Sequence, residues 1–155
     1  GLDLDTFLPG YSQIYGKGKN IPGSALYFAG NPRSISPYII HCMVQSNIIY
    51  EKNILMSVHR NEFPFGIEIR HNQELGPGLE SLEIIAGYKE EVDIGQVIST
   101  QGINPKIIFY GIEDIYTKNF FWGLFSVIKR LSPSFVKFYK VPAAKLHGVV
   151  SRVEI

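Results

Sequence analysis

The sequence is poor in cysteine and in long apolar segments. Cys42 is the single cysteine among 155 residues, so no disulfide can form within the chain, and a reducing compartment is expected. Because Cys42 stands in an apolar stretch, it is expected to be a buried small hydrophobic side chain. The longest apolar run, residues 120–128, is interrupted by Gly123 and Ser126 and is too short to cross a membrane. No signal peptide is recognisable.

The chain also lacks the motifs of common catalytic and metal sites. It has neither a G-x-G-x-x-G nor a P-loop pattern, and "PGSA" is not the sharp turn that carries a nucleophilic serine. The four histidines have no metal-ligand spacing (His41, His59, His71 and His147). Neighbouring carboxylates at Glu90-Glu91 and Glu113-Asp114 point apart along a helix or strand and are expected to be solvated. The sequence therefore predicts no enzyme, no metal and no cofactor.

The charges nearly balance overall but are unevenly distributed. The net charge is +1, which gives no general argument for binding nucleic acid, and none is expected as a partner. Residues 62–93 hold eight acidic against two basic residues, whereas residues 116–155 hold seven basic against one acidic residue. Either these are two solvated faces, or the basic end lies near anionic lipid headgroups or an anionic ligand.

What is present predicts one compact α/β (or α+β) domain. Hydrophobic residues make up 45% of the chain, enough for a substantial core. Strands are expected at residues 24–29, 54–59, 67–70, 81–88, 107–110 and 146–155, and helices at 37–48, 93–99, 119–131 and 133–139. Because strands alternate with helices, we expect a mixed, largely parallel sheet with flanking helices, and an edge or hairpin strand at 67–70.

The two ends of the sequence suggest a piece of a larger protein. Residues 1–19 combine an acidic stretch with a Gly/Lys-rich segment and are expected to be a lead-in or linker from a preceding membrane region, with the domain itself at 20–155. The chain begins at Gly1 without a methionine and ends on "SRVEI", which resembles the inside of a strand.

One loop could bind an anion. It follows the first expected strand and leads to a helix that Ser36 could cap and Pro37 could begin. Free N–H groups and the helix dipole favour anions at such a place, which is also the usual ligand side of a parallel sheet. The candidate residues are Asn31, Arg33, Ser34 and Ser36 of this loop, with His59 and Arg60 from the next strand. The alternative is an ordinary strand-to-helix loop with a capping serine.

The aromatic residues between 120 and 139 are interleaved with bases. Stacking on nucleic acid can produce such a pattern, but the helical spacing of Phe121, Phe125 and Ile128 favours helices packed on a sheet. A docking face for another domain or subunit is the second interpretation.

A series of motifs resembles the cytosolic C-terminal domain of the KUP family of potassium uptake permeases. These are "IPGSALYF" (21–28), "SPYIIHCMVQSNIIYEKNILMSV" (36–58), "FYGIEDI" (109–115) and "FYKVPAAKLHGVVSRVEI" (138–155). Their order matches over residues 20–155. The sequence departs from the family pattern at Asn20 and Ile112, where the family has arginines, and at Cys42, where it has asparagine.

The resemblance implies a larger membrane protein that takes up K⁺, with proton coupling, through a membrane region outside this sequence. This domain would lie at the cell membrane on the cytoplasmic side, contact the membrane domain of the same polypeptide, and regulate or dimerise the transporter as a homodimer. Some family members are inhibited by cyclic di-AMP, so a nucleotide second messenger is a candidate ligand. The alternatives are a free-standing nucleotide sensor and a domain that works only through dimerisation.

Overall fold

A computed structural model describes residues 1–31, 33–111 and 146–149. The elements in chain order are β1 (Leu2–Asp3), α1 (Leu4–Tyr15), β2 (Ile21–Phe28), β3 (Ser34–Ile35), α2 (Pro37–Ile40), the π-helical segment η1 (His41–Gln45), β4 (Tyr50–Asn61), β5 (Ile67–Gly76), β6 (Leu79–Gly87), α3 (Ile94–Thr100), β7 (Ile107–Gly111) and β8 (Leu146–Val149). The expected helices at 119–131 and 133–139, the aromatic residues between 120 and 139 and nearly all of the basic segment 116–155 lie outside the described residues.

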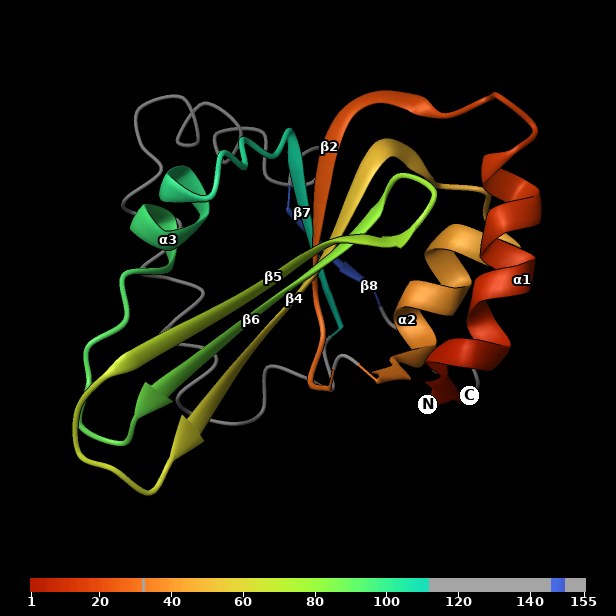
Figure 1. Cartoon of the computed structure of the whole chain (residues 1–155). Coiled ribbons are helices and arrows are strands. Elements are labelled where there is room, and N and C mark those ends of the chain that lie inside the picture. The colour runs from red at the N-terminus through yellow and green to blue at the C-terminus, as the bar shows by residue number, and fades with distance from the viewer. Residues whose placement is uncertain (32, 112–145, 150–155) are drawn as a thin grey trace.

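Six strands form one sheet in the order β5-β6-β4-β2-β7-β8 (Figure 1). β2 lies parallel to β4 and β7, β4 to β6, and β7 to β8, whereas β5 and β6 form an antiparallel hairpin. The expected mixed, largely parallel sheet of an α/β domain is confirmed, as is the hairpin strand at the edge. β1 and β3 form a separate two-stranded pair.

Helices cover both faces of this sheet. α1, α2 and η1 lie on one side, and α3 lies on the other (Figure 1). Side chains alternate along the strands, so Leu55 of β4 joins the core beneath α1 and α2, whereas its neighbours Ile54 and Met56 join the core beneath α3. As expected, Asp93 caps α3, because its carboxylate accepts a hydrogen bond from the Gln96 N–H at 3.1 Å.

The helix between β2 and β4 is shorter than its apolar spacing predicts. It begins at Pro37 as expected, but Ser36 makes no side-chain capping hydrogen bond, and the helical segment ends at Gln45 rather than at residue 48. Asn47 adopts a left-handed backbone (φ 55°), and the Ile48 N–H turns back to the Cys42 carbonyl at 2.8 Å. Asparagine tolerates this conformation, so the chain ends the helix here and enters β4 early.

Residues 1–19, which were expected to be a lead-in or linker, include a helix that packs on the sheet. Most of this segment is α1, whose first turn is capped by the Asp3 carboxylate accepting from the Asp5 N–H at 3.1 Å. Phe7 and Tyr11 lie one helical turn apart and are both buried in the core beneath α1 and α2. The acidic stretch and the Gly/Lys-rich segment suggested a linker. Burying two aromatic rings nevertheless stabilises the helix and outweighs the low helix propensity of Pro9 and Gly10.

Tyrosine hydroxyls fasten α1 to the sheet. Tyr11 donates to the Pro77 carbonyl at 2.7 Å, and Tyr15 donates to the Glu51 carbonyl at 2.8 Å. Gly78, in the turn between β5 and β6, makes room for this contact. Its φ is +60°, and a β-carbon there would lie 2.4 Å from the Tyr15 ring. Other residues rarely adopt this backbone conformation, and a side chain there would displace the Tyr15 ring.

A single buried amide connects these pieces. Asn53 of β4 is fully buried; its amide nitrogen donates to the Tyr50 carbonyl at 2.8 Å and lies 3.2 Å from the Gly78 carbonyl and from the Tyr11 hydroxyl. Its amide oxygen accepts from the Tyr50 N–H at 2.9 Å. β4, the β5–β6 turn and α1 thus share one polar side chain inside an apolar core.

We expect Asn53→Ala to lower the free energy of unfolding by about 3 kcal/mol, because several buried polar groups lose their partner at once. Urea unfolding followed by circular dichroism measures the loss. The matched control is Asn72→Ala, since Asn72 is exposed and accepts one hydrogen bond from the Glu74 N–H at 2.9 Å. Equal losses in the two variants would contradict the central role of Asn53.

Candidate functional site

Four of the predicted anion-binding residues share one loop at the carboxyl end of β2. The Asn31 side chain accepts a hydrogen bond from the Arg33 N–H at 2.9 Å, which tightens the loop, and both side chains are exposed. Ser34 pairs with Asp3 through β3 and β1. Ser36 stands just before α2 and is partly exposed.

His59 and Arg60 lie on β4 and face opposite sides of the sheet, because side chains alternate along a strand. Arg60 is on the side of α3, where its guanidinium donates to the Gly87 carbonyl at 2.9 Å and to the Glu90 carbonyl at 2.5 Å. It holds the end of β4 against the segment that leads to α3. The geometry therefore gathers Asn31, Arg33, Ser34 and Ser36 but turns Arg60 away from them.

The electrostatics of this loop are mixed. Asp3 lies directly opposite Ser34 in the β1–β3 pair, which brings a carboxylate close to the place expected for an anion. The α2 N-terminus is also a weak anion site, because Pro37 has no N–H and the Ile39 and Ile40 N–H groups are bonded to the Ser36 carbonyl.

Ser57 is a polar residue that sequence reasoning missed. It lies on β4 and is 1% exposed, and its hydroxyl has no hydrogen-bond partner among the residues that the structure describes. Alternation places it on the same side of the sheet as His59, toward α2. The signal was a single hydroxyl residue inside the apolar run Ile54–Val58.

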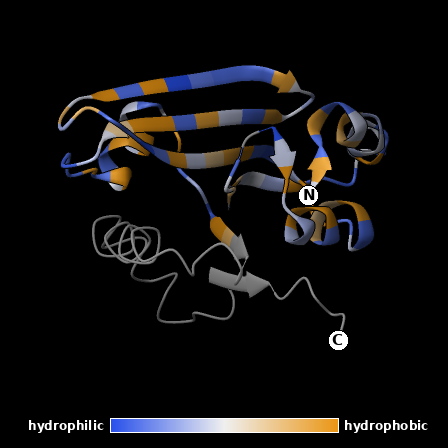
Figure 2. Cartoon of the chain, turned by 90° about the horizontal axis from the view of Figure 1, so that it is seen from below, coloured by the Kyte–Doolittle hydropathy of each residue, from blue (hydrophilic) through white to orange (hydrophobic). Residues whose placement is uncertain are grey.

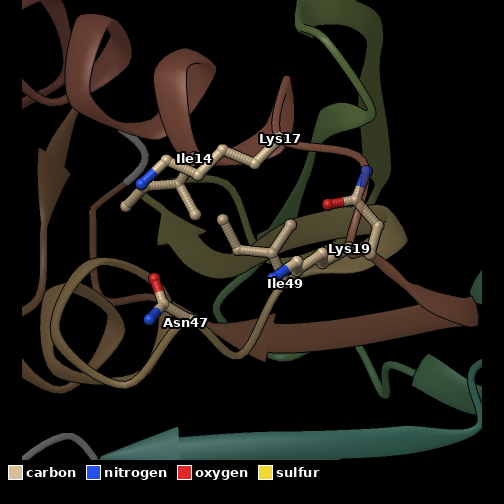
Figure 3. Close-up of a pocket in the computed structure, with 6 residues that line it drawn as sticks. Ile14, Lys17, Lys19, Asn47 and Ile49 are labelled. Atoms are coloured by element: carbon tan, nitrogen blue, oxygen red, sulfur yellow. The ribbon is translucent and has the colours of Figure 1, made fainter.

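A pocket of about 220 Å³ opens at the opposite end of the strands (Figure 3). Residues from the end of α1, the start of β2 and the segment before β4 line it (Ile14, Lys17, Lys19, Asn20, Asn47 and Ile49). The lining combines two lysine ammonium groups and two asparagine amides with two isoleucine side chains. Such a lining suits a small anion that also has an apolar portion. The lysines also follow the C-terminal end of α1, where the helix dipole favours cations, and the sequence signal "YGKGKN" is equally compatible with a loop.

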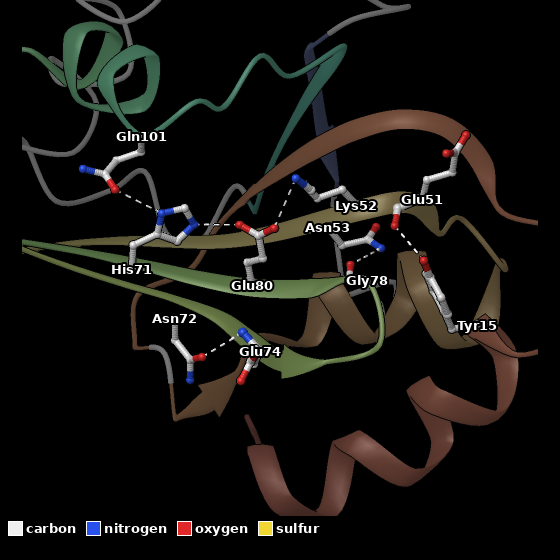
Figure 4. A network of polar contacts seen from close by, with 10 residues as sticks. All are labelled: Tyr15, Glu51, Lys52, Asn53, His71, Asn72, Glu74, Gly78, Glu80 and Gln101. Atoms are coloured by element: carbon white, nitrogen blue, oxygen red, sulfur yellow. Dashed lines mark hydrogen bonds and ion pairs between the residues drawn. The ribbon is translucent and has the colours of Figure 1, made fainter.

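A second polar cluster lies on the α3 side of the sheet, where β5 and β6 meet the end of α3 (Figure 4). The His71 Nε2 lies 2.6 Å from Glu80 Oε1, and its Nδ1 lies 3.1 Å from the Gln101 side-chain oxygen. Lys52 approaches the other Glu80 oxygen at 3.4 Å. The His71 and Glu80 side chains are only 8% and 9% exposed, so the contact between them is buried, whereas Lys52 reaches solvent. This cluster connects the edge strand β5 to the strands β6 and β4 and to the end of α3.

Other reactive groups offer little chemistry within the described ranges 1–31, 33–111 and 146–149. No group of three or more His, Cys, Asp or Glu is placed there to hold a metal ion. Cys42 is buried, and burial raises the pKa of its thiol to about 11, so it is not a thiolate nucleophile at neutral pH.

The sequence profile of the K+ potassium transporter C-terminal domain matches residues 22–155. The chain belongs to this family. The resemblance found in the motif series is confirmed, and the family is one of transporters rather than a class of enzymes.

Curated relatives extend the match to nearly the whole chain. The probable potassium transport system protein Kup 2 of Geobacter metallireducens and the probable Kup of Geotalea uraniireducens are each 53% identical over 154 residues. The corresponding protein of Methanosarcina barkeri is 49% identical over 149 residues. The alignments cover 99%, 99% and 96% of this chain, and the first two therefore include α1, which precedes the profile match at residue 22.

The chain spans about a quarter of the length of these relatives, 25% of the first and 26% of the second. No solved structure matches it. Among the residues described, none of the helices has both the length and the apolar character of a membrane span.

We expect His71→Leu to lower the free energy of unfolding by about 2 kcal/mol, because the buried carboxyl group of Glu80 loses its closest hydrogen-bond partner. The double variant His71→Leu with Glu80→Leu should recover most of that loss, since it removes both polar groups. Thermal unfolding of the two variants tests this coupling. Glu74→Gln, at an exposed position of the same strand, is the control and should change little. A double variant less stable than the single one would rule out the explanation.

Proposed function

We propose that this chain is the cytosolic C-terminal module of a Kup-type potassium transporter, and that it regulates transport and joins two transporter subunits. K⁺ uptake coupled to H⁺ would reside in a membrane region of the same polypeptide. One observation carries the proposal: identity near 50% with potassium transport system proteins over 99% of this chain but only a quarter of theirs.

The fold supports this role. Helices cover both faces of the sheet, and hydrogen bonds from Tyr11 and Tyr15 fasten α1 to the β5–β6 turn and to the start of β4, so a displacement of α1 would act on both. In the complete polypeptide we place the membrane region before α1 (Leu4–Tyr15) in chain order. A movement of that region would then reach the β5–β6 turn through Tyr11 and Asn53.

The test is K⁺ uptake by cells that lack their own uptake systems and express the complete polypeptide, with and without the region of this chain. We expect the complete protein to restore growth at low K⁺. The truncated protein should still take up K⁺, but its uptake rate should no longer change under the conditions that change the uptake rate of the complete protein. A complete coding region without membrane segments, or one that never restores uptake, would overturn the proposal.

A second candidate function is ligand sensing, and the cationic pocket supports it. Lys17 and Lys19 provide two positive charges, and Asn20 and Asn47 provide amides. At about 220 Å³ the pocket is smaller than most pockets for complete cofactors, so it would hold a phosphate and the sugar attached to it rather than a whole dinucleotide. The loop at Asn31–Ser36 is the alternative binding site for the same kind of nucleotide ligand.

Calorimetric titration with cyclic di-AMP separates the two places. If the pocket binds, Lys17→Ala with Lys19→Ala should weaken binding more than about tenfold, since each lysine contributes a charge-assisted hydrogen bond. Arg33→Ala with Ser36→Ala should then have little effect, and the reverse result would favour the loop. Lys89→Ala is the matched control, because Lys89 lies far along the chain beside Tyr88. Absence of binding by the unaltered chain would contradict the sensor function.

A further inference from the structure

β5 is the outermost strand on its side of the sheet. It pairs with β6 and with no other described strand, so among the described residues no strand pairs with the backbone N–H and C=O groups of its outer edge. Figure 2 shows this strand at the rim of the sheet, with a hydrophilic middle. Such an edge either carries features that repel a second strand or is suited to receive one.

The opposite charges of Glu68 and Arg70 on β5 need not repel a second copy. Glu68 and Arg70 point to the same face, form an ion pair at 2.6 Å, and have side chains that are 58% and 61% exposed. Edge strands that avoid association commonly carry charged side chains, especially lysine, or a proline. Here the two signs lie two residues apart, so an antiparallel copy can meet each charge with its opposite.

Only certain registers use this complementarity. When a two-fold axis passes beside Ile69, Glu68 of each copy faces Arg70 of the other, and four alternating charges lie together. An axis beside Glu68 or beside Arg70 instead opposes like charges, which destabilises strand pairs. Registers centred farther along the strand are disfavoured because the β5–β6 ladder becomes irregular after Asn72.

The opposite face of β5 fits the same register. Ile67 is 46% exposed, although it belongs to the row of side chains that includes Ile69 and His71 on the α3 side. With the axis beside Ile69, Ile67 would face His71 of the second copy, and the two Ile69 side chains would face each other. The exposed isoleucine would thus gain apolar and aromatic cover.

We propose that β5 pairs antiparallel with β5 of a second copy in the register centred on Ile69, which joins two sheets into one. This inference rests on the proposed assembly function and specifies its surface. Main-chain hydrogen bonds would supply the affinity, as in other strand additions, and Glu68 with Arg70 would set the register.

Disulfide trapping tests the register. Ile69→Cys should form an intermolecular disulfide under mild oxidation, because directly opposed residues have β-carbons about 5 Å apart. Ile67→Cys is the control; it faces position 71 of the second copy and should cross-link at least about tenfold more slowly. Cys42 is buried and present in both variants. Equal cross-linking at both positions would overturn the register.

Charge reversal tests the partner. Glu68→Arg alone and Arg70→Glu alone should each raise the dissociation constant of the dimer at least about tenfold, measured by sedimentation of the 155-residue chain. A mixture of the two variants should associate again, because the first variant carries two positive charges on this face of β5 and the second carries two negative charges. Thermal unfolding of each variant checks that the fold is intact.

The outcomes separate the inference from the function on which it rests. A dimer that ignores both charge reversals, and shows no recovery on mixing, overturns the β5 interface but leaves assembly through another surface. A chain that stays monomeric into the millimolar range overturns this interface and the dimerisation role together, leaving the edge to another part of the polypeptide.

Discussion

The amide of Asn53 is the constraint on which the rest of the fold depends. It is fully buried, and its nitrogen and oxygen serve β4, the turn between β5 and β6, and the hydroxyl of Tyr11 on α1. Moving any of these pieces would leave polar groups unpaired in a low-dielectric core, where the cost is high. The amide therefore fixes the register of β4 and the position of α1 on the sheet. The residues on these two elements are positioned with them.

Two potential ligand places lie at opposite ends of the sheet because of this arrangement. The loop at Asn31–Ser36 follows the carboxyl end of β2, where parallel sheets usually bind ligands. The lysine pocket lies at the amino ends of β2 and β4 and exists because α1 ends beside Asn47. Since α1 is placed by its contacts with Asn53 and the β5–β6 turn, the pocket is a product of tertiary packing.

The β5 strand has two roles that its alternating side chains separate. Toward α3 it carries His71, which pairs with buried Glu80 and anchors the strand within its own sheet. Toward the other face it carries Glu68 and Arg70, both exposed. A firmly held edge with self-complementary charges is suited to assembly, and transporters built from two copies would bring two such edges to one place.

Local sequence patterns were sufficient to predict the parallel sheet with its helical crossover, the hairpin at the edge, the cap at Asp93 and the family, because these follow from periodicity, capping and an ordered motif series. They could not predict α1, because the stabilisation that Phe7 and Tyr11 contribute depends on their burial in a core formed by strands far away in the sequence. Local patterns likewise could not predict that Arg60 points away from the loop or that the Ser57 hydroxyl is buried. Nor could they predict that Lys17 and Lys19 lie beside Asn47. Those positions come from tertiary packing, because burial and hydrogen bonding between residues far apart in the chain outweigh local propensity.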